Sequence, residues 1–303
     1  MGTKKQIDSL MFRCAHPGTS NNTFSIFYNN MDIQPYLDSF PLPAKRGILS
    51  DINKEKTEKA IQEAMKDPEA VASQIVKRLI DPGAEGNDIQ ARHLLHTMAV
   101  RIPDHGSKVK SNKRAKFSLV LAKALSEDHP DRVKAFVIRQ LQICGGEEVV
   151  PAIGAFLVVA GIADDAAQAL IAIGKGSSEQ FRKALPKVKN NSILYRNVLH
   201  GLAELADESS KEFFLEAIVN KDDECRLLGL WGLTQIGDSS TLESFLKADQ
   251  NEKGFSRIKA ASYCLKFAEK VKKKDADKIY RHLQKTRTLP EEKYLQQIAV
   301  SNL

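Results

Sequence analysis

The sequence predicts an all-α protein in which antiparallel helix pairs stack into an α-solenoid, with a period of about 31 residues. Five stretches end alike, at Gly145, Gly174, Ala206, Gly237 and Ala268, so the intervals between them are 29, 32, 31 and 31 residues. Each stretch carries apolar residues at helical spacing, and a shorter helical pattern precedes each one. Composition agrees, because 42% of the residues are hydrophobic but only 7% are aromatic, which suits helix-on-helix packing.

The longer helix of each unit has one apolar side. Four residues before each closing position stand Leu141, Leu170, Leu202, Leu233 and Cys264. Apolar residues also recur one and seven residues before that position, and this spacing keeps them on one side of an α-helix. We expect these rows to form the core, and Cys144 and Cys264 to be buried, reduced thiols. Small residues eight before the closing position predict close contact between neighbouring helices.

One complete unit reads VVPAIGAFLVVAGIADDAAQALIAIG. Residues 149–159 are its expected first helix, with Pro151 in the first turn, where proline is tolerated. Asp164 and Asp165 begin the second helix, where acids favour the positive end of the helix dipole. The 15 uncharged residues from Val149 to Ala163 are too few for a membrane span, which needs about 20 apolar residues. We therefore expect no membrane partner.

The two ends of the chain depart from the repeat. Residues 1–48 are predicted to be an irregular N-terminal arm, because HPGTSNNTF and FPLPAKRG are typical of turns and loops. The arm is apolar enough to pack on the first repeats or to fill the groove, and a disordered tail is the alternative. Residues 49–303 are expected to form about seven helix pairs with a C-terminal cap, since Glu292 stands at an apolar position of the last unit. No long apolar stretch opens the chain, which favours the cytoplasm, although a removed leader would look the same.

The tandem of helix pairs resembles the HEAT-repeat family, particularly the short bacterial variety related to PBS-lyase repeats. The stretches GGEEVVPAIGAFL and RLLGLWGLTQIGD carry this resemblance best, and it covers about residues 67 to 303. The resemblance implies a solenoid whose second helices line a concave surface, and it implies a binding scaffold. Many bacterial members accompany a catalytic domain, and none is visible in this sequence.

If the second helices face inward, the residues two, six and nine before each closing position line the concave face. The partner-binding residues predicted in this way are Phe136, Arg139, Ile143, Gln168, His200, Glu204, Leu228, Trp231, Gln235, Lys259 and Lys266. Phe136 with Arg139, and Leu228 with Trp231, are the sharpest candidates, because Trp and Arg are typical anchors of binding surfaces. The alternative is that Trp231 and Phe136 fill gaps between repeats.

Positive charge is concentrated near the C-terminal end of the chain. Residues 251–287 contain twelve basic and four acidic residues, a net charge of +8, whereas the whole chain carries +7. Lys270, Lys273 and Lys274 are candidates for phosphate contact at the end of one helix. The alternative is a solvated helix end, where lysines are favourable in any case. A second basic run, residues 108–116, is expected to lie in a loop.

No catalytic constellation stands out. His93 and His96 share a helical face, but no acid or cysteine is fixed beside them, so we predict no metal site and no cofactor. The sequence favours a non-enzymatic scaffold that binds a protein or peptide on the concave face. One alternative is nucleic-acid binding through residues 251–287, since some alkylpurine DNA glycosylases consist of similar HEAT-like helices. Another is an accessory subunit of a separate enzyme.

Overall fold

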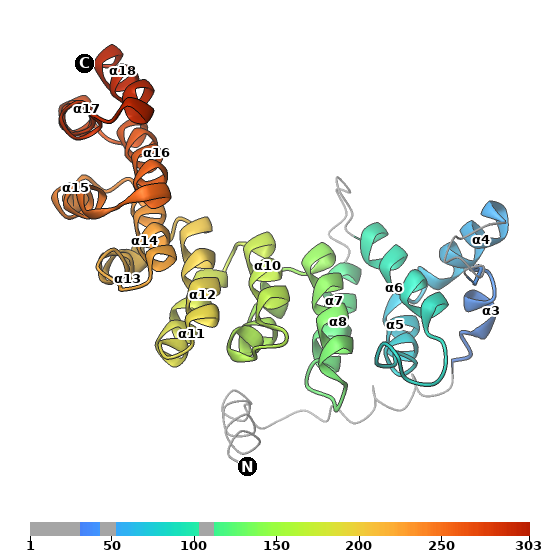
Figure 1. The fold of residues 1–303 in the computed structure, drawn as a ribbon. Coiled ribbons are helices and arrows are strands. Elements are labelled where there is room, and N and C mark those ends of the chain that lie inside the picture. The colour runs from blue at the N-terminus through green and yellow to red at the C-terminus, as the bar shows by residue number, and fades with distance from the viewer. Residues whose placement is uncertain (1–30, 43–52, 103–111) are drawn as a thin grey trace.

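The computed structural model describes residues 31–42, 53–102 and 112–303, and all regular structure in these ranges is helical (Figure 1). The α-helices are α3 (Gln34–Leu37), α4 (Lys54–Ala64), α5 (Pro68–Val76), α6 (Ile89–Arg101), α7 (Lys113–Ala124), α8 (Asp131–Cys144), α9 (Val150–Gly154), α10 (Ala163–Ile173), α11 (Ser177–Ala184), α12 (Ser192–Glu204), α13 (Lys211–Ala217), α14 (Asp223–Ile236), α15 (Leu242–Asn251), α16 (Gly254–Lys270), α17 (Lys273–Thr286) and α18 (Lys293–Ser301). Short 3₁₀ helices are η2 (Glu147–Val149), η3 (Ala155–Val158), η4 (Leu185–Val188), η5 (Glu208–Ser210), η6 (Ser239–Thr241) and η7 (Pro290–Glu292). Among the helices described, none is long and apolar enough to cross a bilayer.

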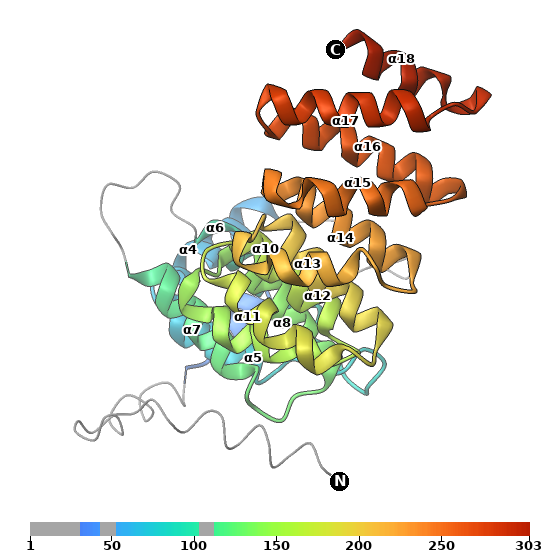
Figure 2. The ribbon, with the colours of Figure 1, turned by 90° about the vertical axis from the view of Figure 1, so that its left-hand side faces the viewer.

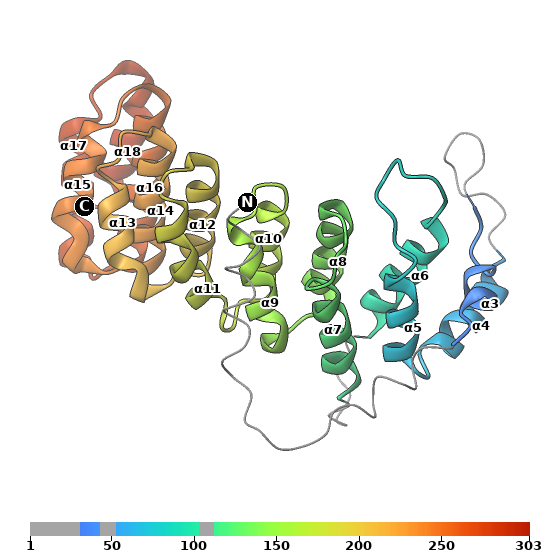
Figure 3. The ribbon, with the colours of Figure 1, turned by 90° about the horizontal axis from the view of Figure 1, so that it is seen from below.

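The helices form two rows along an arc. Helices α10, α12, α14 and α16 lie on the inside of the arc, and α11, α13, α15 and α17 lie on the outside (Figure 1). Figure 2 shows α13, α15 and α17 stacked in order, and Figure 3 shows the helices following one another along the arc. Successive inner helices from α8 to α16 pack directly on one another. The chain is therefore an all-α solenoid, as the repeat predicts.

The predicted core rows are buried. Leu141, Leu170, Leu202 and Leu233 are each fully inaccessible to solvent. Because each inner helix contacts the next, these leucines belong to one continuous apolar core that runs through the stack. Among the cysteines that the structure describes, Cys144, Cys225 and Cys264 are free and buried, which confirms the expectation for Cys144 and Cys264. Burial raises the pKa of Cys144 to about 11, so its thiol stays protonated and unreactive near neutral pH.

The closing positions end helices, as the repeat predicts, with one instructive exception. Gly145, Gly174 and Gly237 each follow directly after an inner helix, and Gly174 and Gly237 have φ angles of 73° and 69°. Ala206 also has a positive φ, of 49°, a region that disfavours side chains other than glycine. The exception is Ala268, because α16 continues to Lys270. Alanine neither breaks a helix nor favours a left-handed cap, so nothing local stops the helix there.

Two expected elements differ in the structure. Residues 149–159 form no single helix, because α9 is only five residues long and 3₁₀ turns flank it. A Cβ atom on Gly154 would lie 2.6 Å from Gln180 Oε1, so α11 approaches the segment closely where α9 ends. The second basic run is helical from Lys113 onward, where a loop was expected. The reason is Arg114, which donates to Glu148 Oε1 at 2.8 Å and so fixes the start of α7.

Glycines on the inner helices admit aromatic rings from the outer helices. A Cβ atom at Gly201 would lie 2.3 Å from Phe181 Cε1, and a Cβ atom at Gly232 would lie 2.3 Å from Phe214 Cε1. Both phenylalanines are fully buried. These glycines stand five residues before the closing positions, whereas the sequence pattern drew attention to the position eight before. At that position Gly229 does approach Ile218 closely, as expected.

The described part of the N-terminal arm packs on the first helices. Ile33, Leu37 and Phe40 are buried, and α3 contacts α4 and α6. The Thr57 hydroxyl donates to the Ser39 carbonyl at 2.7 Å, which ties the arm to α4. The predicted boundary at residue 48, and the apolar residues Phe24, Ile26, Phe27 and Tyr28, lie outside the described residues. The division into an arm and a solenoid therefore stays a prediction.

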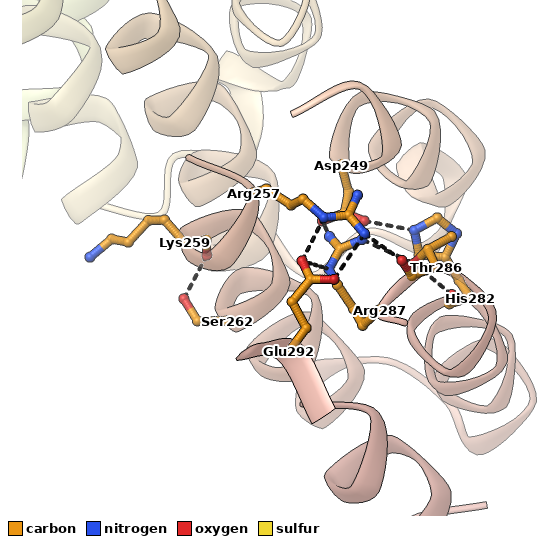
Figure 4. A network of polar contacts seen from close by, with 8 residues as sticks. All are labelled: Asp249, Arg257, Lys259, Ser262, His282, Thr286, Arg287 and Glu292. Carbon is orange, nitrogen blue, oxygen red and sulfur yellow. Dashed lines mark hydrogen bonds and ion pairs between the residues drawn. The ribbon is translucent and has the colours of Figure 1, made fainter. Parts of the chain in front are cut away.

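A buried polar cluster joins the last units (Figure 4). His282 Nε2 lies 2.7 Å from Asp249 Oδ2, and Arg287 pairs with the same carboxylate. Arg257 Nε donates to Glu292 Oε1 at 2.5 Å. Glu292 is only 1% exposed, as the apolar position it takes in the repeat implies, and Arg257 and Arg287 neutralise its charge there. On α18, by contrast, the apolar side chains of Tyr294 and Ile298 are exposed.

Candidate functional site

Trp231 is the centre of the best-connected group of side chains on the inner row. Its indole nitrogen donates to Glu204 Oε1 at 2.9 Å, which links α14 to α12. On the other side its ring lies 5.3 Å from the ring of Tyr263 on α16, tilted by 37°. Lys266 Nζ lies 4.9 Å from the centre of the indole ring, within range of a cation–π interaction. Trp231 thus contacts both neighbouring repeats.

The group extends further in both directions. His200 Nε2 lies 3.5 Å from Glu204 Oε1 on α12, and Lys259 Nζ lies 5.7 Å from the Tyr263 ring centre on α16. Burial, together with the charges of Glu224 and Glu204, raises the pKa of Tyr263, so its hydroxyl is neutral at physiological pH. We call the following six residues the Trp231 strip: His200, Glu204, Trp231, Lys259, Tyr263 and Lys266.

The strip combines aromatic rings with unpaired positive charge. Trp231 and Tyr263 are half-buried and pack against the core, so each fills a gap between repeats while part of its ring remains accessible. Lys259 and Lys266 are exposed, and neither forms a salt bridge with any residue that the structure describes. Trp231 thus packs between repeats, as the gap-filling alternative states, and it also remains partly exposed, as a binding residue must be.

Five of the predicted partner-binding residues belong to this strip, and a second predicted group lies nearer the N-terminus. Arg92 of α6 stacks over the Phe136 ring at 4.6 Å, and Arg139 Nη1 lies 2.8 Å from Asp165 Oδ1. Ile143 is 40% exposed, and Gln168 is exposed as well. In the described part of the chain, no hydrogen bond, ion pair or ring contact joins this group to the Trp231 strip.

The remaining predicted residues serve the helix ends or the core. Leu228 is half-buried against the core. Lys270 Nζ donates to the Gln235 carbonyl and to Gln235 Oε1, both at 2.8 Å, and so caps the C-terminus of α14. Lys273 and Lys274 do not share the end of α16, where they were expected, but open α17 after a turn. Val271 and Lys272 separate the end of α16 at Lys270 from the start of α17 at Lys273. Lys273 and Lys274 therefore stand at a helix N-terminus, where the helix dipole disfavours positive charge.

Tyr263 is the residue that the sequence pattern missed. It stands five residues before its closing position, where the other units carry Gln140, Ala169, Gly201 and Gly232. An aromatic residue at a position that is otherwise small or polar was a usable signal. Its contact with Trp231 depends on the packing of α16 against α14, which no single unit reveals.

The histidines singled out in the sequence take part in other contacts. His96 Nδ1 lies 3.0 Å from Gln140 Oε1, and the His93 ring lies 6.1 Å from the Phe40 ring. Across residues 31–42, 53–102 and 112–303, no group of three or more His, Cys, Asp or Glu side chains is placed to hold a metal ion. His105 lies outside those ranges.

Comparison with known proteins found similarity of structure only. No family model matches the chain, and no curated protein matches its sequence. The structure of Kap121p bound to Pho4p aligns with 88% of this chain at 11% identity and a TM-score of 0.49, and Kap121p bound to Nup53p aligns with 95% at 11% identity and a TM-score of 0.47. This chain spans 36% and 37% of the length of those two chains.

Proposed function

We propose that this chain is a HEAT-type scaffold that binds a protein or peptide segment along the inner row formed by α12, α14 and α16. The Trp231 strip is the observation that carries the proposal. It sets half-buried aromatic rings beside two lysine ammonium groups that have no acidic partner among the described residues. Stacked repeats offer a long continuous surface to such a partner, and Trp is a typical anchor residue at interfaces.

Nucleic-acid binding has less support from the same residues. Lys270, a candidate for phosphate contact, is already engaged by Gln235. The carboxylates of Glu204 and Glu224 act on Tyr263 electrostatically, so negative charge lies beside the aromatic rings where a phosphate backbone would run. A nucleic-acid groove would instead need a continuous run of free cations.

A peptide selection tests the proposal. Peptides enriched from a displayed random library on the full chain should protect backbone amides of α12, α14 and α16 from hydrogen exchange. The variant Trp231→Ala should weaken their binding at least tenfold, about 1.4 kcal/mol, because it removes the central ring. Tyr280→Ala is the matched control, since Tyr280 is a half-buried aromatic residue of the outer helix α17.

Three results would count against the proposal. The first is a library that yields no enriched peptide. The second is protection confined to the outer helices α11, α13 and α15. The third is equal weakening by the Trp231 and Tyr280 variants, because this would indicate a general loss of stability and not the loss of a contact.

A further inference from the structure

We infer that the segment bound at the Trp231 strip is acidic, with two carboxylates roughly 10 Å apart and an apolar side chain between them. This inference rests on the proposed function and specifies the partner's chemistry. It starts from Lys259 and Lys266, which lie seven residues apart on α16. At 1.5 Å per residue, seven residues are about two helical turns and about 10.5 Å, so both lysines rise from the same side of the helix.

The two ammonium groups flank an aromatic surface. Lys259 Nζ lies 5.7 Å from the Tyr263 ring centre, and Lys266 Nζ lies 4.9 Å from the Trp231 ring centre. The two rings are in turn 5.3 Å apart. A ligand with charge at both ends and an apolar group in the middle would therefore meet a cation, two rings and a second cation in that order.

Lys259 and Lys266 are the cations of the last repeats that lie over aromatic rings, and neither has a carboxylate partner among the described residues. Arg257 pairs with Glu292, Lys278 with Asp275, and Arg226 with Glu252. Lys259 extends away from the buried cluster around Arg257 (Figure 4), and its only described charge interaction is with a ring. A partner carboxylate could approach either lysine without displacing a carboxylate of this chain, so the charge-assisted hydrogen bonds gained would not break an internal ion pair.

The surroundings favour an acidic peptide over a polyphosphate. Glu204 and Glu224 lie near enough to Tyr263 to influence its ionisation. They would repel a continuous line of phosphates more strongly than two separate carboxylates, because every phosphate of the line carries a negative charge. A polyproline II segment meets the charge spacing, because residues three apart return to the same side at about 9 Å, and the apolar residue between them projects from an adjoining side of the peptide.

The test uses fluorescence polarisation with a labelled peptide, Gly-Pro-Pro-Glu-Leu-Pro-Glu-Pro-Pro-Gly, on the full chain. A peptide with glutamine in place of both glutamates is expected to bind at least tenfold more weakly. The double variant Lys259→Gln with Lys266→Gln is expected to lose at least tenfold for the glutamate peptide. The matched control is Lys247→Gln with Lys285→Gln, which removes the same charge from exposed sites on the outer helices α15 and α17 and is expected to change binding less than twofold.

The outcomes separate this inference from the proposed function. If glutamate and glutamine peptides bind alike, or if both double variants weaken binding equally, the acidic preference is overturned. If the glutamate peptide does not bind while library-selected peptides still protect α12, α14 and α16, only this inference fails. If a short oligothymidylate binds more tightly than the glutamate peptide and depends on Lys259 and Lys266, the ligand is a nucleic acid and the inference is overturned.

Discussion

Replacing Gly232 with alanine measures how tightly the two rows of helices are packed. The new Cβ atom would lie 2.3, 2.4 and 2.6 Å from Phe214 Cε1, Cδ1 and Cγ. Phe214 is fully buried in α13 and its ring is rigid, so the ring or α14 itself must move. Overpacking of a core costs roughly 1–3 kcal/mol, and three ring atoms in overlap place this site at the upper end. Alanine returns about 1 kcal/mol through helix propensity, so the expected net loss is about 2 kcal/mol.

The chain carries a built-in probe for this change. Trp231 is its only tryptophan and neighbours Gly232 on α14, so its fluorescence during a urea titration follows the unfolding of this region. The midpoint should fall without a change in slope, because the surface exposed on unfolding stays the same. Gly161→Ala is the control: the nearest atom to its Cβ atom is Asp131 Oδ2 at 3.5 Å, so its effect should stay within about 0.5 kcal/mol.

A second substitution isolates the contact itself. Phe214→Leu should cost less stability in the Gly232→Ala background than in the natural chain, because the smaller side chain relieves the overlap. A Gly232→Ala variant as stable as the natural chain would refute the reasoning, since α13 and α14 would then be packed loosely enough to admit the extra methyl group. So would full additivity of the two substitutions.

The buried cluster of the last units makes two further predictions. Arg287→Met should lower the free energy of unfolding in urea by about 3 kcal/mol, because it removes a cation that pairs with the buried Asp249 carboxylate. Arg281 is exposed on the same helix, so Arg281→Met is the control and should change the stability little. Burial acts to raise the pKa of Glu292, but the hydrogen bond and charge of Arg257 outweigh it, so the pKa lies below its ordinary value of 4.5. The stability from this group should therefore be complete above about pH 4.5 and be lost as the pH falls through the lowered pKa. Thermal unfolding from pH 7 to pH 3 checks this, and Glu292→Gln should flatten the dependence.

The fold was predictable because each repeat carries the same local information. The leucine row at Leu141, Leu170, Leu202 and Leu233 specifies both the helix and its buried side, and the closing glycines specify where three of the helices end. Departures from the repeat arise where one helix is shaped by another. The close packing at Gly154, where α9 ends, depends on Gln180 of the next unit, and the start of α7 depends on Glu148, more than 30 residues away.

The candidate site was predictable only in part, because periodicity places a residue on a face but does not show what it touches. It placed Trp231, Lys259 and Lys266 on the inner row. It could not show that Lys270 donates to the Gln235 carbonyl at the end of α14, or that the Tyr263 ring packs beside Trp231. Both facts depend on the rotation of α16 relative to α14, which is a property of the stack and not of one unit.

The buried cluster offers a physical reason for that rotation. Arg257 reaches from α16 into the cluster and is held by Glu292, whereas Lys259 points away from it on the same helix (Figure 4). A buried ion pair adds little net stability, but an arrangement that leaves its charges unpaired is strongly disfavoured. Rotation of α16 about its axis would withdraw Arg257 from Glu292, so the cluster favours the orientation in which Lys259 points away from it. Charges buried on one side of α16 thus help to fix the direction of the free charge of Lys259 on the other.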